Sequence, residues 1–234
     1  MEHANGSIKN CYMKIEINQH AGIGDILFLE PILRELAVSN EIYMPVVEPW
    51  HWQRHIPYVN FTNFTFQFDN YKQEFTPKYY PFRYANPIFR GYDLNDWHDF
   101  ENCMLDKYRV LGLPDDMWLN LNVTRDKQNE SRLIEQLNLP KEFILVNEFS
   151  RAGNKSIVPI TDLPIIHMRE IDGFSVIDWC GVMELAAENH HVSTSTFYLL
   201  HMLGLDAKIY PRPNEDGLRG ISQLIPMTKL TSVL

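Results

Sequence analysis

The sequence has few cysteines, and they are poorly placed for disulfide or metal chemistry. Cys11, Cys103 and Cys180 are odd in number and far apart, and none belongs to a CxxC pair. This pattern favours a reducing compartment. The sequence also lacks HExxH and Asp-x-Asp motifs, and the adjacent His190 and His191 cannot both face one metal from a regular element. We therefore expect no metal and no cofactor, and we interpret the two histidines as structural or loop residues.

Long apolar runs and basic clusters are missing as well. No stretch of ~18 apolar residues is present to span a membrane, and the first ten residues lack the apolar segment of a secretory signal. Lys and Arg total 21 against 30 Asp and Glu, a formal charge of -9, and no basic stripe is visible. This balance argues against nucleic acid as a partner and predicts a cytoplasmic protein without a transmembrane segment.

Apolar residues make up 45% of the 234 positions. Their spacing predicts strands that alternate with helices along the chain. Alternation of this kind predicts an α/β fold with parallel sheets and ligands at the carboxyl ends of the strands. A proline-rich aromatic loop is expected over 69–93, and a connection between two lobes over 115–125. Strands are predicted over 13–18, 42–47, 59–68, 143–147, 165–168, 175–177 and 207–210. Helices are predicted over 26–38, 97–111, 129–137 and 181–188, and after residue 196 through Leu203, with a stop at Gly204.

The first candidate site is the glycine turn between the first strand and the first helix. Gly22, Gly24 and Asp25 stand there, and glycines allow a ligand to approach the backbone closely. Asp25 fits a general base that accepts a proton from an attacking hydroxyl. The competing interpretation, which the spacing alone favours, is that Asp25 merely caps the helix.

The second candidate site is the hydroxyl run Ser193, Thr194, Ser195 and Thr196, which precedes an apolar helix. Backbone amides and hydroxyls at a helix start suit a diphosphate. An ordinary N-cap run is the competing interpretation.

The third candidate site is the loop 147–156, which follows an apolar strand. The loop contains Ser150, Arg151 and Lys155, which can bind the negatively charged phosphate of a nucleotide. A solvated surface loop with incidental charges is the alternative.

Two of these segments resemble the heptosyltransferase-like group of GT-B glycosyltransferases. That family begins with a strand, a Gly-Asp turn and a helix with a proline, which correspond to Gly22, Gly24, Asp25 and Pro31. Toward its end it has an Asp-Thr-Gly-x-x-His-Leu helix start and then Leu-Gly. This chain reads Ser-Thr-Ser-Thr-Phe-Tyr-Leu over 193–199, followed by Leu203 and Gly204.

The resemblance implies a compact GT-B-like enzyme with two small Rossmann-like lobes whose parallel sheets face a central cleft. Residues 1–120 would form the acceptor lobe, and 121–234 the lobe that binds the nucleotide sugar. Asp25 takes the place of the base, Lys155 that of a phosphate-contacting lysine, and Thr194 to Thr196 that of the donor diphosphate site. Ser150 and Arg151 are assigned to the donor site only because they lie in the same loop as Lys155. The implied reaction is an inverting, metal-independent transfer of a hexosyl or heptosyl group to a carbohydrate or other hydroxyl acceptor.

Departures from the family pattern keep other functions open. Ser193, Ser195 and Tyr198 stand where the family has Asp, Gly and His. A protein of the same fold that binds a nucleotide or nucleotide sugar without turning it over is therefore the second interpretation. Aromatic residues over 71–97 fit a sugar-stacking acceptor face and a hydrophobic core equally well. A dinucleotide-dependent oxidoreductase is disfavoured, because Leu27 replaces the third glycine of GxGxxG.

Overall fold

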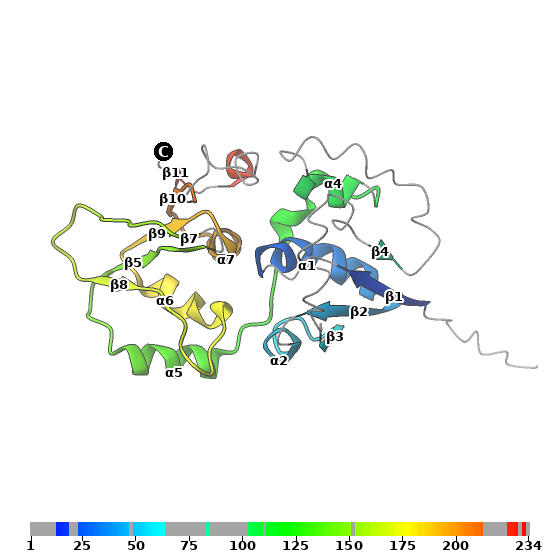
Figure 1. Cartoon of the computed structure of the whole chain (residues 1–234), viewed down its shortest axis with the longest axis horizontal. Helices are drawn as coiled ribbons and strands as arrows, with labels where there is room; N and C mark the ends of the chain where they lie inside the picture. Colours follow the sequence, from blue (N-terminus) through cyan, green and yellow to red (C-terminus); the bar gives the residue numbers. More distant parts are fainter. Residues whose placement is uncertain are drawn as a thin grey trace, which may run out of the picture.

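In a computed structural model of the chain, the described residues form two larger β-sheets and a two-stranded hairpin, with helices between and around the larger sheets (Figure 1). The first sheet comes from the first part of the sequence and the second from the last part. The predicted mixed α/β fold with parallel sheets is confirmed. No helix in the described part of the chain is both long and apolar enough to cross a membrane. The structure describes residues 13–18, 23–46, 49–63, 83–84, 103–109, 111–150, 153–212, 224–228 and 231–232.

The first sheet has four strands in the order β3-β2-β1-β4. Strands β1 to β3 are parallel, and the short β4 pairs antiparallel with the end of β1. Ile15 and Ile17 on β1 are buried, as are Ile42 and Met44 on β2, which is the period of two expected for a strand that packs one face on the core. The elements are β1 (Met13–Asn18), α1 (Ile23–Ala37), β2 (Asn40–Val46), α2 (Pro49–Gln53), β3 (Val59–Asn63) and β4 (Arg83–Tyr84).

Three helical segments lead from the first sheet to the second. They are α4 (Cys103–Arg109), the 3-10 helix η4 (Asp115–Asn120) and α5 (Lys127–Leu137). The Asp126 carboxylate caps α5 by accepting from the N–H of Asn129 at 3.0 Å. The helix ends at Asn138, whose φ of 46° lies in the left-handed region that asparagine tolerates.

The second sheet has five strands in the order β11-β10-β9-β5-β8, and every neighbouring pair is parallel. A separate hairpin, β6-β7, follows β5. The elements are β5 (Ile144–Asn147), β6 (Phe149–Ser150), β7 (Gly153–Asn154), β8 (Ile165–His167), η5 (Val176–Trp179), α6 (Cys180–Leu185), β9 (Glu188–Val192), α7 (Ser195–Leu203), β10 (Lys208–Tyr210), η6 (Ile225–Met227) and β11 (Thr231–Ser232).

Three local predictions are wrong in the second half of the chain. Residues 148–155 contain the β6-β7 hairpin rather than an irregular loop. Residues 175–177 lead into η5 rather than a strand, because Ser175 and Asp178 form a capping box. Residues 189–191 do not end a helix but lie inside β9, which is paired on both sides. The predicted aromatic loop at 69–93 lies outside the described residues, apart from the two residues of β4.

The apolar core continues from one sheet to the other through α1 and α7, which lie side by side in the middle of Figure 1. An aromatic cluster fills the space between these helices and η4, with neighbouring ring centroids 5.1 to 6.2 Å apart. Such spacings are typical of edge-to-face and offset aromatic pairs. The aromatic cluster consists of the buried residues Phe28, Tyr108, Trp118, Phe197 and Tyr198.

A polar contact also links the first and last parts of the sequence. It joins the turn after α2 to the 3-10 helix η5. Arg54 Nη2 donates to Oδ2 of the fully buried Asp178 at 2.5 Å. Beside it, His55 Nδ1 lies 2.8 Å from the Thr124 carbonyl oxygen, and His55 Nε2 accepts from Arg54 Nε at 3.0 Å. A ring that donates through Nδ1 and accepts through Nε2 is neutral. Burial lowers the pKa of His55 and favours the same state.

Candidate functional site

The beginnings of α1 and α7 are in contact between the two sheets (Figure 1). A Cβ atom added to Gly24 would lie 3.5 Å from the Cα of Ser195 and 3.3 Å from the Tyr198 ring. A methyl group at this position would make an ordinary contact with Ser195 and a tight one with the Tyr198 ring, so the two helix starts pack closely here. Two helix starts, each with the positive end of its helix dipole, therefore meet at one place.

The first helix starts earlier than predicted, at Ile23 instead of residue 26. Gly24 and Asp25 consequently lie in the first helical turn and not in a loop before it. Gly22 lies outside the described residues. Asp25 is therefore not the residue that caps the helix, as one interpretation predicted. As an acidic side chain in the first turn it interacts favourably with the helix dipole, and its catalytic role stays a prediction.

Asp25 has a charged partner from a distant part of the chain. Lys107 on α4 donates from Nζ to Asp25 Oδ1 at 2.9 Å across 82 residues of sequence. The side chain of Lys107 is 8% exposed and that of Asp25 is 28% exposed. The carboxylate is therefore held by a nearly buried ammonium group while part of it still faces outward.

The hydroxyl run spans the end of β9 and the first turn of α7. Thr194 occupies the N-cap position, but its side chain makes no capping hydrogen bond. Instead, Asn147 Nδ2 donates to Thr194 Oγ1 at 3.2 Å and to Thr196 Oγ1 at 3.3 Å. Thr194 and Ser195 are partly exposed, whereas Ser193 and Thr196 are buried. The run is not the ordinary side-chain cap that was the competing interpretation.

The third predicted segment forms the hairpin at the carboxyl end of β5. Ser150 Oγ donates to the Gly153 carbonyl oxygen at 2.6 Å, and the backbone N–H of Lys155 donates to the Glu148 carbonyl oxygen at 3.1 Å. Lys155 thus returns to the edge of the sheet where β9 ends and α7 begins, since β5 and β9 are parallel neighbours. Arg151 lies outside the described residues.

The adjacent histidines of β9 point to opposite faces of the sheet and are both buried. His190 contacts Glu188 Oε2 at 2.9 Å through Nε2 and Tyr210 Oη at 3.0 Å through Nδ1. Both ring nitrogens of His191 lack a hydrogen-bond partner within the described residues. Complete burial lowers the pKa of His191 to about 3. No group of three metal-ligating side chains occurs in the part of the chain that the structure describes.

We expect His191 to make stability fall at acidic pH. Its pKa is lower in the folded chain, so its contribution is complete above the unfolded value of about 6.5 and is lost as the pH falls toward about 3. The loss approaches about 1.4 kcal/mol per pH unit within that window. Urea unfolding of the wild type and His191→Gln between pH 7 and pH 5 measures the difference.

The control for this experiment is His167→Gln, because the His167 side chain is 52% exposed and lies 3.3 Å from Glu148 Oε2. It should leave the pH dependence of the wild type unchanged. Equal pH slopes for the wild type and His191→Gln would show that the buried ring contributes nothing.

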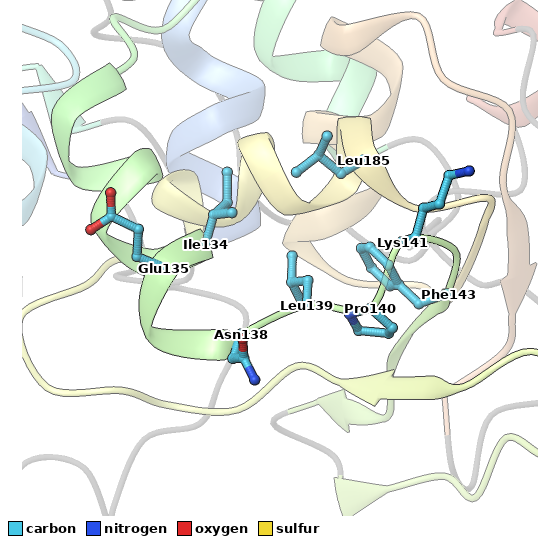
Figure 2. A pocket seen from close by; sticks show the side chains of 8 residues that line it. All are labelled: Ile134, Glu135, Asn138, Leu139, Pro140, Lys141, Phe143 and Leu185. Carbon is cyan, nitrogen blue, oxygen red and sulfur yellow. The ribbon is translucent and has the colours of Figure 1, made fainter.

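A separate pocket of about 490 Å³ lies between the ends of α5 and α6 (Figure 2). Its walls are largely apolar, with Ile134, Leu139 and Leu185 among them, and the charged ends of Glu135 and Lys141 point away from one another. The pocket lies just before β5 begins, at the amino ends of the parallel strands. Ligands of open α/β sheets bind at the opposite, carboxyl ends, so we do not take this pocket as the functional site.

Sequence reasoning missed Lys107, and it included Asn147 only as the first residue of the third candidate loop, without a role of its own. Lys107 lies in a segment correctly expected to be helical, but no spacing rule links it to Asp25. Asn147 ends an apolar strand, and a polar residue at that position of a parallel strand is a recognisable signal for a site. The other predicted residues divide into two groups: Gly24, Asp25, Thr194, Ser195 and Thr196 lie at the meeting helix starts, while Ser150 and Lys155 lie on the neighbouring hairpin.

Comparison with known proteins supports the fold. No family model and no curated protein matches this sequence. Among solved structures, the chain is similar to the glycosyl transferase family 9 from Veillonella parvula DSM 2008, with a TM-score of 0.51 and 9% sequence identity. The alignment covers 95% of this chain and 86% of the other. At such low identity the similarity extends to the Rossmann-like α/β fold and no further.

Proposed function

We propose that this protein is a GT-B glycosyltransferase that moves a sugar from a nucleotide sugar to an acceptor hydroxyl. The contact between the starts of α1 and α7 supports the proposal, because it brings Gly24, the residue before Asp25, against Ser195 in the hydroxyl-rich start of α7. The similar solved structure is a glycosyl transferase. In this proposal, an acceptor lobe of residues 1–120 and a donor lobe of residues 121–234 face each other across this contact.

The proposed donor site is the start of α7. The first amides of the helix have no side-chain cap, and the helix dipole favours negative charge there. Lys155 adds a positive charge at the same edge of the sheet, and the hydroxyls of Thr194 and Ser195 are partly exposed. These groups would stabilise a diphosphate without a divalent metal, so the proposed reaction is metal-independent.

The proposed transfer is a single displacement. The Asp25 carboxylate accepts the proton of the acceptor hydroxyl, and the acceptor oxygen forms a bond to the anomeric carbon. The bond between that carbon and the diphosphate oxygen breaks, and its electron pair leaves with the diphosphate. The start of α7 and Lys155 stabilise the charge that develops on the leaving group. Attack opposite the leaving group inverts the anomeric carbon.

A protein that only binds a nucleotide or nucleotide sugar is the second candidate function. The observation that favours it is the 2.9 Å ion pair between Lys107 and Asp25. This ammonium group competes with an acceptor hydroxyl for the carboxylate. A chain in which the pair persists after the donor has bound would hold the ligand without turning it over.

We expect nucleoside diphosphates, or their sugar conjugates, to stabilise the chain. At a ligand concentration of about 100 times Kd, the stabilisation is about 2.7 kcal/mol, which raises Tm by roughly 5 to 10 °C. A thermal-shift panel of nucleoside diphosphates and nucleotide sugars measures this. The parent nucleosides, which lack phosphates, should give smaller shifts, and NAD and NADP should give none.

Turnover then separates the two candidate functions. Hydrolysis or transfer of the sugar from a stabilising nucleotide sugar supports the enzyme, whereas stabilisation without turnover supports the binding protein. A panel in which no phosphate-bearing compound shifts Tm would count against both.

A further inference from the structure

Thr194 stands at the N-cap position of α7 but does not act as a cap. A threonine there usually accepts a hydrogen bond from the N–H two or three residues later. Here Thr194 Oγ1 accepts from Asn147 Nδ2 at 3.2 Å and donates to the Val192 carbonyl oxygen at 3.3 Å. The hydroxyl is turned back toward the sheet and caps no amide of α7. The Phe197 N–H donates to the Thr194 carbonyl oxygen at 3.0 Å, which leaves the amides of Ser195 and Thr196 as the ones that a ligand can reach.

The orientation of Asn147 accounts for this arrangement. Its Oδ1 accepts from the backbone N–H of Phe149 at 3.2 Å, which directs its NH₂ group toward the threonines. One side chain thus contacts both Thr194 Oγ1 and Thr196 Oγ1. Asn147 is only 5% exposed, so water does not readily replace it in these contacts.

An unpaired hydroxyl lies beside the uncapped helix start. Ser193 is 2% exposed, and its Oγ has no hydrogen-bond partner in the described part of the chain. Along β9, Ser193 shares a face with Asn189, whose Nδ2 donates to the Met183 carbonyl oxygen on α6. Ser193 therefore faces the layer of helices in which α7 begins two residues later. A buried donor without a partner costs free energy unless a ligand or water satisfies it.

We propose that Asn147 is a positioning residue that turns the Thr194 hydroxyl away from α7 and thereby reserves the first amides of the helix, with the Ser193 hydroxyl, for phosphate oxygens. This inference rests on the proposed function, which supplies the phosphate-bearing ligand. It goes further by stating why the helix start is uncapped. In the protein without ligand, Asn147 keeps the start of α7 without a side-chain cap, which makes this end of the helix less stable. The phosphate oxygens of a bound ligand then accept hydrogen bonds from the uncapped amides.

Two substitutions of Asn147 test this role in different ways. Asn147→Asp keeps the shape but places a negative charge at the helix start, where it repels phosphate. Asn147→Leu removes the donor, so Thr194 is free to turn and cap α7. We expect Asn147→Asp to weaken binding of the nucleoside diphosphate by about tenfold or more. Asn147→Leu should weaken it by a smaller factor and should also lower Tm, because the Phe149 N–H loses its acceptor.

Isothermal titration calorimetry measures these affinities. The probe is the nucleoside diphosphate that gives the largest thermal shift, and its parent nucleoside is the phosphate-free control. Binding of the nucleoside should be unchanged in both variants, which also shows that they fold. The double variant Asn147→Leu with Thr194→Val should recover part of the lost affinity, because valine has no hydroxyl to occupy the amides.

Each outcome bears on the proposal. If the double variant binds as weakly as Asn147→Leu, or if Asn147→Asp binds like the wild type, Asn147 does not act through Thr194 and the inference is wrong. The proposed function survives that result, because the wild type still binds the diphosphate. If the wild type binds no phosphate-bearing compound, the proposed function and the inference both fall.

Discussion

Replacing Asp25 with Asn is expected to slow sugar transfer roughly 100- to 10,000-fold, the usual range for removal of a general base. Asparagine keeps the size of the side chain, and its amide oxygen still accepts from Lys107 Nζ, so the geometry of the helix start should persist. It cannot take the proton from the acceptor hydroxyl. Affinity for the donor should not fall, since Asp25 is not proposed to contact the diphosphate. Steady-state kinetics with the nucleotide sugar from the thermal-shift panel, together with calorimetric binding, separate kcat from affinity.

Asp115→Asn is the matched control for this experiment. Asp115 also pairs with a basic side chain, Arg109, at 2.6 Å, but it lies on η4 and is 37% exposed. Its substitution should leave transfer unchanged. If Asp25→Asn turned over as fast as the wild type, Asp25 would have no part in the chemistry, and the interpretation as a helix-stabilising charge would remain.

Replacing Asp178 with Ala is expected to lower the free energy of unfolding by about 3 kcal/mol or more. The fully buried carboxylate accepts from Arg54 Nη2 at 2.5 Å, from the backbone N–H of Ser175 at 2.6 Å and from Ser175 Oγ at 3.0 Å. Alanine leaves these donors without their acceptor and removes the capping box of η5. Urea unfolding followed by circular dichroism measures the loss.

The control here is Asp115→Ala, which breaks an exposed ion pair. Such pairs contribute about 0 to 1 kcal/mol, so its midpoint should lie close to that of the wild type. An equal decrease in the free energy of unfolding for Asp178→Ala and Asp115→Ala would mean that the contact between Arg54 and Asp178 does not stabilise the packing of η5 on the turn after α2.

The sequence predicted the elements whose boundaries are set locally. β1 runs over residues 13–18 as expected, and α7 ends at Leu203 because Gly204 adopts a left-handed φ of 66°. β9 was missed because its sequence, Glu-Asn-His-His-Val, has little strand propensity. Its place between β5 and β10 supplies the pairing that makes it a strand, and such long-range context overrides local preference.

The candidate site was predictable only in part, for a similar reason. Glycine, aspartate and hydroxyl residues next to strand ends pointed to the starts of α1 and α7. Their contact depends on Gly24 and Tyr198, which are far apart in the sequence. The partners of the site residues, Lys107 for Asp25 and Asn147 for Thr194, are likewise set by packing. The division into lobes at residue 120 and the cleft between them stay predictions.

The aromatic cluster also constrains how this protein can be recombined with its relatives. Trp118 lies between Phe28 from the first part of the chain and Phe197 from the last part, and all three rings are buried. A chimera that joined the first sheet of this chain to the second sheet of another protein would pack these rings against side chains of a different shape. In an engineered chimera, the two parts can therefore be exchanged only if the three rings are exchanged with them, because a close-packed interior tolerates poorly fitting side chains badly.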